Sequence, residues 1–251
     1  MRSLTVLIPV RNEKEAIPPL FTRFVDAASD FPADWELLLV DGCSSDGTPD
    51  LAETWADRLP VRVHRLSENR GLGGALEAGL LETIERSDVI VTMDGDDSHD
   101  PHTIPSMLRM ITDGADMVIA SRFEPGGEEI GVAGYRKALS HGASGLLRIL
   151  YPVGDAKDYS SGFRAYRSTA LEQVRNRYGR LVEESGFSCM MELLLKLRGT
   201  GADVREVPLV LRYDLKPTES KMDIGHTIRR YLVIIGRNLP TAGRRLEPRR
   251  P

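Results

Sequence analysis

Short apolar runs alternate with amphipathic helical patterns through the first half of the chain. The runs are rich in valine, isoleucine and leucine and cover residues 4–10, 35–41, 61–66, 88–94 and 115–121. The helical patterns between them cover residues 18–28, 50–59, 73–86 and 103–113. This alternation predicts a doubly wound α/β sheet whose strands are mostly parallel and are joined by right-handed crossovers. Ligands of such sheets bind at the carboxyl ends of the strands.

The alternation weakens after residue 122. Helices are expected near 134–150 and 186–199, and strands at 163–166 and 204–213. No linker rich in proline, glycine and serine divides the chain. Residues 1–222 are therefore predicted to form one domain, in which the second half completes the ligand site.

The C-terminal segment, residues 223–251, is predicted to have a different role. One helical face carries apolar side chains with arginines beside them, namely Ile228, Tyr231, Leu232, Ile235 and Leu239. Residues 226–251 hold seven arginines and one glutamate, net +6, whereas the rest of the chain holds 26 basic and 36 acidic residues, net −10. A basic amphipathic helix with an arginine-rich tail predicts contact with a membrane surface that carries anionic lipid.

Composition limits the class of protein and its location in the cell. The 251 residues are 41% hydrophobic and 28% charged, close to the averages of a soluble globular domain. The net charge of −4 argues against a nucleic-acid partner, and no apolar run approaches the roughly 18 to 20 residues of a spanning helix. Cys43 and Cys189 lack CxxC spacing, which favours a reducing compartment. We expect a cytoplasmic protein, peripheral at the cytoplasmic face of the membrane, with an N-terminal strand in place of a signal peptide.

The segment VTMDGDDSHDP carries the sharpest chemical signal. Asp94 and Asp96 stand two apart directly after an apolar strand, with Asp97 and Asp100 nearby. Such a pair supplies oxygen ligands to Mg²⁺ or Mn²⁺ while phosphate oxygens of a ligand complete the coordination. The alternative is an acidic loop that is only solvated or caps the next helix.

Polar loops also follow the first two strands. The first ends in IPVRNE and the second in VDGCSSDGT. Asp41 is placed to accept hydrogen bonds from a ribose or a base, as strand-end carboxylates do in nucleotide sites. Alternatively, Asp46 and Thr48 only cap the next helix, and Glu13 is a first-turn acid favoured by the helix dipole.

The glycine-rich segment NRGLGGALEAG is not a dinucleotide fingerprint. Leu76 occupies the place of the third glycine in GxGxxG, and the segment is no P-loop. Its glycines are interpreted as permitting tight turns and close helix packing.

These segments, in this order, resemble the inverting GT-A glycosyltransferases of the dolichol-phosphate-mannose synthase type. The resemblance also includes ASRFEPGG, SGFRAY and ESKM, and it covers about residues 4 to 222. It implies the GT-A fold, a Rossmann-like, mostly parallel sheet flanked by helices. It also implies a metal-dependent transfer of a mannose- or glucose-type sugar from a GDP- or UDP-linked donor to a polyprenyl phosphate.

The resemblance assigns residues to three parts of the site. It implies donor contacts from Pro9, Arg11, Glu13, Val40, Asp41, Asp94, Gly95, Asp96 and Lys221. Metal ligands would be Asp94, Asp96 and Ser98, the last standing where the family often has a glutamine. An acceptor-phosphate cradle would consist of Arg122, Arg136 and Ser140, so the residues expected to act in catalysis are Asp94, Asp96, Arg122 and Arg136. From the residues alone, Arg136 with Lys137 is an ordinary solvated pair, and Lys221 a surface lysine.

Several positions depart from the family pattern. Gly42 and Cys43 replace an aspartate and a glycine, and Arg11 replaces an aromatic residue. Leu215 stands where the family has an arginine six residues before the late lysine, although Arg212 and Lys216 are close by. These changes leave the identity of the donor open.

The acceptor decides the mechanism. A phosphate monoester is already an anionic nucleophile at neutral pH and needs positioning more than deprotonation. A sugar hydroxyl would need a carboxylate base, for which Asp158 and Asp97 are candidates. The alternatives are a transferase of the same fold acting on a soluble small molecule or glycan, a nucleotidyltransferase, or a non-catalytic sugar-nucleotide-binding module.

Overall fold

The computed structural model describes residues 3–154, 156–217 and 223–238. Seven strands form one sheet in the order β3-β2-β1-β4-β7-β5-β8. Their bounds are β1 Ser3–Val10, β2 Asp34–Asp41, β3 Val61–Arg65, β4 Val89–Thr92, β5 Met117–Ser121, β7 Arg164–Arg167 and β8 Val204–Pro208. All neighbours are parallel except β7, which runs antiparallel to both β4 and β5. The predicted mostly parallel sheet is confirmed.

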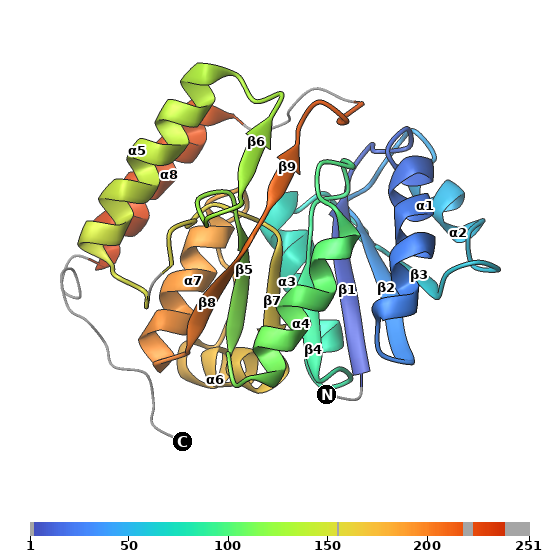
Figure 1. Ribbon diagram of the computed structural model, residues 1–251, viewed down its shortest axis with the longest axis horizontal. Coiled ribbons are helices and arrows are strands. Elements are labelled where there is room, and N and C mark those ends of the chain that lie inside the picture. Colours follow the sequence, from blue (N-terminus) through green and yellow to red (C-terminus); the bar gives the residue numbers. More distant parts are fainter. Residues whose placement is uncertain (1–2, 155, 218–222, 239–251) are drawn as a thin grey trace.

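Helices cover both faces of this sheet (Figure 1). One core cluster joins the sheet to α1 Ile17–Ala27, α2 Thr48–Glu53 and α4 Ile104–Thr112. A second joins the other face to α3 Gly71–Thr83, α6 Ser168–Tyr178 and α7 Cys189–Thr200. Short 3-10 turns at Ala28–Asp30 and Pro101–Thr103 complete the helical elements. The central strands β4 and β5 are buried between two helical layers, which explains why their runs in the sequence are continuously apolar.

A small second sheet lies beyond the carboxyl ends of the main strands. It pairs β6 Glu128–Ile130 with β9 Val210–Arg212 in parallel register. The amide of Arg212 donates to the carbonyl of Ser98 at 2.9 Å, which ties β9 to the acidic loop after β4. The sequence did not predict β6 or α6, and the run at 204–213 is divided at Leu209 into two strands that belong to different sheets.

Two helices stand at one end of the molecule, α5 Gly134–Leu150 and α8 Ile224–Asn238 (Figure 1). The Tyr151 hydroxyl, at the end of α5, donates to the carbonyl of Ile235 in α8 at 2.7 Å. Arg230 of α8 pairs with the buried Glu184, and Ile234 joins the core that contains α3 and α7. The predicted division after residue 222 remains a prediction. Within the described residues, no helix combines the length and the apolar character needed to cross a membrane.

Candidate active site

A cavity of about 820 Å³ opens at the carboxyl ends of the strands. Ten of the predicted site residues line it: Pro9, Arg11, Glu13, Asp94, Gly95, Asp96, Ser98, Arg122, Arg136 and Ser140. Val40 and Asp41 are buried and are not part of its lining. Lys221 lies outside the described residues, so its role stays a prediction. The fold thus brings donor, metal and acceptor residues predicted from distant segments to one cavity.

The acidic pair sits at the polar end of this cavity. The Asp96 Oδ2 atom accepts from the Lys216 ammonium at 2.6 Å, and Oδ1 accepts from the Ser98 amide at 3.1 Å and hydroxyl at 2.5 Å. Burial alone would raise the pKa of Asp96, but Lys216 and His99 lower it below its usual value. Burial raises the pKa of Asp94, and the nearby charge of Asp96 adds to that shift. The pKa values of the two neighbouring carboxyl groups are therefore shifted in opposite directions.

His99 fixes the geometry of Asp94. The Asp94 amide donates to Nδ1 of His99 at 3.2 Å, so in the neutral ring the proton resides on Nε2. That Nε2 atom lies 4.0 Å from Asp94 Oδ2, and the ring stacks on Phe163 with centroids 5.1 Å apart. With Nδ1 engaged by the Asp94 amide and the proton on Nε2, the neutral His99 ring has no free lone pair for a metal, so it holds the backbone of Asp94 and is not itself a ligand.

The acidic pair fits a hard divalent cation. Mg²⁺ and Mn²⁺ prefer oxygen ligands and are commonly held by one or two carboxylates together with substrate phosphates. No group of three histidine, cysteine or acidic side chains suited to a metal occurs in the described part of the chain. A cationic group, Lys216, already rests against Asp96, which shows that the position favours positive charge. The protein thus offers two carboxylates, with Ser98 beside them.

Two glycines allow backbone and carboxylate to approach closely. A Cβ atom on Gly95 would come within 2.6 Å of Val10 Cγ1, so the turn between the two aspartates passes directly over β1. A Cβ atom on Gly162 would come within 2.9 Å of Asp94 Oδ1. In the sequence, Gly162 is visible only as part of SGFRAY, because Asp94 belongs to a distant segment and no local pattern reveals the contact.

The loops after β1 and β2 are joined to each other. The Asn12 amide donates to the Ser44 hydroxyl at 2.8 Å, and the Asn12 side-chain oxygen accepts from the Ser45 amide at 2.8 Å. Asn12, Cys43 and Asp97 all have positive φ values, 53°, 64° and 66°, in the loops after β1, β2 and β4. A left-handed backbone conformation is unfavourable for residues other than glycine and persists where surrounding contacts hold it. Such residues often cluster at functional sites.

Asp41, Asp46 and Thr48 are engaged by nearby backbone. Both Asp41 oxygens accept from the Ser44 amide, at 3.1 and 3.2 Å. Asp46 accepts from the Thr48 amide at 2.9 Å, and the Thr48 hydroxyl accepts from the Glu13 amide at 2.9 Å. Neither is the N-cap of α2, which is Gly47 and has no side-chain cap, so the capping interpretation is wrong. Asp41 shapes the loop, and its predicted contact with a nucleoside stays a prediction.

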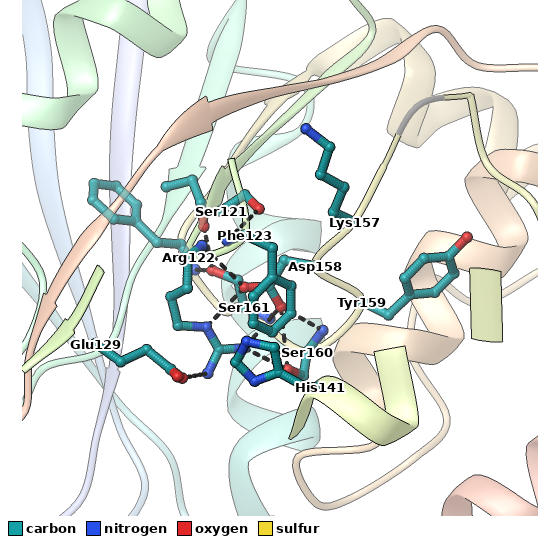
Figure 2. Close-up of polar contacts among 12 residues, drawn as sticks. Ser121, Arg122, Phe123, Glu129, His141, Lys157, Asp158, Tyr159, Ser160 and Ser161 are labelled. Carbon is teal, nitrogen blue, oxygen red and sulfur yellow. Dashed lines mark hydrogen bonds and ion pairs between the residues drawn. The ribbon is translucent and has the colours of Figure 1, made fainter. Parts of the chain in front are cut away.

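Arg122 lies between two carboxylates (Figure 2). Its Nε and Nη2 atoms each donate to one oxygen of Asp158 at 2.8 Å, and Nη1 donates to Glu129 at 3.2 Å. Asp158 is fully buried and also accepts from the amides of Ser160 and Ser161. Burial would lower the pKa of Arg122 and raise that of Asp158, but the pairing reverses both shifts. This pair fixes the floor of the cavity, and the role of Arg122 in binding a phosphate stays a prediction.

The other two residues of the predicted cradle come from α5. The Arg136 Nη1 atom donates to the Tyr213 hydroxyl at 3.3 Å. The Ser140 hydroxyl oxygen is buried and has no hydrogen-bond partner among the described residues. Tyr213 also lies under Lys216, whose ammonium is 5.4 Å from the ring centroid. A single aromatic residue therefore connects the acidic end of the cavity with its arginine-bearing wall.

Asp97 points away from this cavity. It pairs with Arg23 of α1, whose Nη2 atom also donates to the Asp97 carbonyl at 2.5 Å. Asp97 is buried and is not among the lining residues. Arg23 thus anchors the left-handed turn that follows Asp96, a role that the sequence did not reveal.

Comparison with known proteins places this chain in a family. The family model described as "Glycosyl transferase family 2" matches residues 5–175. A dolichol-phosphate mannosyltransferase of Pyrococcus furiosus is 36% identical over 230 residues, 91% of this chain and 61% of that protein. This chain therefore spans less than two thirds of that relative. An undecaprenyl-phosphate mannosyltransferase of Micrococcus luteus is 35% identical over 227 residues, 90% of this chain and 89% of that protein.

Solved structures support the fold. Glucosyl-3-phosphoglycerate synthase of Mycobacterium tuberculosis, in complex with Mn²⁺, UDP-glucose and phosphoglyceric acid, superposes with a TM-score of 0.69 at 22% identity, covering 95% of this chain and 80% of that one. The sheet and its flanking helices, together with the family match, thus define a glycosyltransferase of the GT-A fold. The chain belongs to glycosyl transferase family 2.

Proposed function

We propose that this protein transfers a mannose-type sugar from a nucleotide diphosphate donor to a polyprenyl phosphate, with inversion at the anomeric carbon. The observation that carries the proposal is the two-ended character of one cavity. Asp94, Asp96 and Lys216 form a charged end, and apolar side chains of α5 and α8 form the opposite end. The mannosyltransferase names of the relatives from Pyrococcus furiosus and Micrococcus luteus support the same sugar and acceptor class.

The charged end suits the donor. When bound by Asp94 and Asp96, Mg²⁺ or Mn²⁺ would neutralise negative charge on the leaving diphosphate. Pro9, Arg11 and Glu13 line the neighbouring wall, where the resemblance places the nucleoside. Whether the nucleoside is guanosine or uridine is decided by the assay below.

The opposite end suits a lipid phosphate. Arg136 and the unpartnered Ser140 hydroxyl face the same cavity as Arg122. Beyond them the lining is apolar and comes from both helices: Ala138, Leu139, Ala143, Leu146, Leu147, Ile228 and Tyr231. A phosphate at the arginines would leave its isoprenoid chain against these side chains. A short polar acceptor would leave this apolar surface uncovered.

The transfer needs few proton movements. An oxygen of the acceptor phosphate attacks the anomeric carbon, and the bond from that carbon to the donor diphosphate breaks. The electron pair of that bond leaves with the nucleoside diphosphate. The products are a glycosylated polyprenyl phosphate and the nucleoside diphosphate. The phosphate is ionised at neutral pH, so the residues of this chain position it and are not required to deprotonate it.

The two carboxylates that could act as bases for a hydroxyl acceptor, Asp158 and Asp97, are both paired with arginines. Asp158 is fully buried against Arg122, and Asp97 is paired with Arg23 outside the cavity lining. Glu129, which does line the cavity, is likewise bound to Arg122. This arrangement favours an acceptor that brings its own negative charge.

We further propose that α5 and α8 rest on an anionic membrane surface at the cytoplasmic face. Their exposed apolar side chains include Leu146, Ile149 and Leu232, with exposed fractions of 49%, 75% and 61%. Exposed arginines accompany them, Arg148 on α5 and Arg229 on α8. The predicted contribution of the basic tail lies outside the described residues, which end at residue 238. An interfacial helix pair of this kind would present the mouth of the cavity to lipid phosphates.

One assay tests the proposal and its rivals. The protein is incubated with Mn²⁺ or Mg²⁺, a panel of GDP- and UDP-sugars and a short polyprenyl phosphate, and the products are identified by mass. The proposal predicts a glycosylated polyprenyl phosphate and a nucleoside diphosphate in equal amounts. Transfer only to sugar or small-molecule hydroxyls would favour the soluble-acceptor alternative, and release of pyrophosphate would favour a nucleotidyltransferase. Absence of turnover with any acceptor would favour a binding module.

A further inference from the structure

Lys216 occupies the side of Asp96 that a divalent cation would need. Its ammonium lies 2.6 Å from Asp96 Oδ2, and the two side chains are only 9% and 10% exposed. The other oxygen of Asp96 is engaged by Ser98, two residues further along the chain. Because Oδ1 already accepts two hydrogen bonds from Ser98, Oδ2 is the oxygen with room for a metal, and the Lys216 ammonium rests on it.

Lys216 is the partner that can leave. Ser98 belongs to the same turn as Asp96, and its carbonyl is bonded to the Arg212 amide, so it stays with the carboxylate. Lys216 comes from the turn that follows β9, 120 residues away in sequence. Its ammonium has a flexible four-carbon stem and rests over the edge of the cavity beside Tyr213.

We propose that Lys216 is a built-in counter-ion that competes with the divalent cation for Asp96 until a donor diphosphate arrives. This inference rests on the proposed metal site at Asp94 and Asp96. While Lys216 remains near, a divalent cation at Asp96 meets a positive charge a few ångströms away, and this repulsion opposes metal binding. A diphosphate offers Lys216 a new anionic partner and removes the repulsion.

The proposal makes metal and nucleotide binding cooperative. Because coupling between two ligands is reciprocal, the diphosphate must raise the affinity for metal by the same factor by which metal raises the affinity for diphosphate. Removing the charge of Lys216 should raise the affinity for metal alone. It should also reduce the gain in diphosphate affinity that bound metal brings. A residue with only a structural role would weaken both.

The test compares K216M, K216Q and R212M with the wild-type protein. Arg212 is a matched control because it is a cation on the same segment that pairs with Asp214 and not with Asp96. K216Q keeps polar donors without charge, so it separates the charge from the loss of hydrogen bonding. Thermal unfolding first establishes that each variant is folded. Free Mn²⁺ is then measured by electron paramagnetic resonance near neutral pH, without nucleotide and with saturating GDP or UDP.

The expected result is that K216M and K216Q bind Mn²⁺ alone about tenfold more tightly than the wild type, a typical coupling magnitude. The nucleotide should enhance Mn²⁺ binding much less in these variants, and R212M should match the wild type. If the wild type gains Mn²⁺ affinity from nucleotide and both Lys216 variants gain equally, the counter-ion role is wrong and the metal site stands. If the wild type binds no Mn²⁺ even with nucleotide, the proposed metal site fails and this inference with it.

Discussion

Gly162 lies directly against Asp94, so that a Cβ atom on Gly162 would come within 2.9 Å of Asp94 Oδ1. The two residues belong to different loops, one preceding β7 and one following β4. Because β7 is inserted antiparallel beside β4, the end of the loop before it is brought against the acidic pair. The position of the carboxylate is thus defined by the absence of a side chain on the neighbouring loop.

The first prediction follows from this contact. Gly162→Ala should push the Asp94 carboxylate from its place and weaken Mn²⁺ binding by about 10- to 100-fold, the usual effect of disturbing residues that orient metal ligands. Isothermal titration with Mn²⁺ and nucleoside diphosphate measures the change. Gly145→Ala is the control, because a Cβ atom on Gly145 in α5 meets nothing within 4 Å. Equal metal affinities in both variants would contradict the predicted contact.

The second prediction concerns the buried pair of Arg122 and Asp158. Asp158→Asn should lower the free energy of unfolding by about 3 to 5 kcal/mol, because the buried Arg122 guanidinium loses its two-point ion pair and keeps only the longer contact with Glu129. Urea denaturation measures the loss. Asp203→Asn breaks the pair with Arg205, in which both side chains are more than one-third exposed, and should cost under about 1 kcal/mol. Similar losses in the two variants would mean that the buried pair contributes no more to the free energy of unfolding than an exposed pair does.

The same pair predicts a pH dependence of stability. Burial alone would raise the pKa of Asp158, but Arg122 holds it below the usual 3.8. A depressed folded pKa means that the stabilisation is fully present above pH 3.8 and is lost as the pH falls through the lower folded value. The stability difference between wild type and Asp158→Asn should therefore shrink only in strongly acidic solution. Urea denaturation at a series of pH values checks this, and a difference that fades nearer neutrality would contradict it.

A third prediction addresses the attachment of α8. The Arg230 Nε atom donates to Glu184 at 2.7 Å, and this pairing is the main reason that the pKa of Glu184 lies below its usual 4.5. Arg230→Gln should speed amide hydrogen exchange in residues 224–238 by a few-fold, whereas Arg229→Gln on the exposed side of the helix should not. In the wild type, the exchange rate in α8, corrected for the intrinsic pH dependence of exchange, should rise only as the pH falls below 4.5. Unchanged exchange in Arg230→Gln would mean that apolar packing around Ile234 suffices.

A fourth prediction concerns the membrane-facing surface. Ile149→Asp combined with Leu232→Asp should reduce co-sedimentation with anionic vesicles several-fold, because both side chains are well exposed on α5 and α8. Leu81→Asp is a matched control, since Leu81 is 43% exposed on α3, outside these two helices. Equal binding of both variants would place the membrane contact elsewhere on the protein.

The regular part of the fold could be predicted because its signals are local. Four of the five N-terminal strands are apolar runs of the length that a buried strand needs, and the edge strand β3 alternates valine with polar residues; each appears near its expected bounds. The strand β7 was expected only as the short segment FRAY, and nothing local indicates that it runs antiparallel between β4 and β5. The helix α6 was missed because its sequence, STALEQVRNRY, has a weak apolar stripe.

The site could be predicted only where one loop carries the chemistry. Asp94, Asp96 and Ser98 lie within five residues, so their proximity follows from the sequence. The pairs of Arg122 with Asp158 and of Lys216 with Asp96 are 36 and 120 residues apart, and they depend on how β5, β7 and β9 are arranged. The prediction that Val40 lines the nucleoside rested on resemblance alone, and its side chain packs in the core. Any contact it makes with a ligand would have to come from its backbone.

The proposed function depends on Asp94 and Asp96 holding a divalent cation that binds the donor diphosphate. The most direct measurement is calorimetric titration of GDP and UDP into wild-type protein and Asp94→Asn/Asp96→Asn, each with Mn²⁺ or with a chelator. We expect the wild type to bind at least one nucleotide in Mn²⁺ and to bind it at least tenfold more weakly with chelator, and we expect the double variant to show no metal dependence. Equal nucleotide affinity in all four conditions would contradict it.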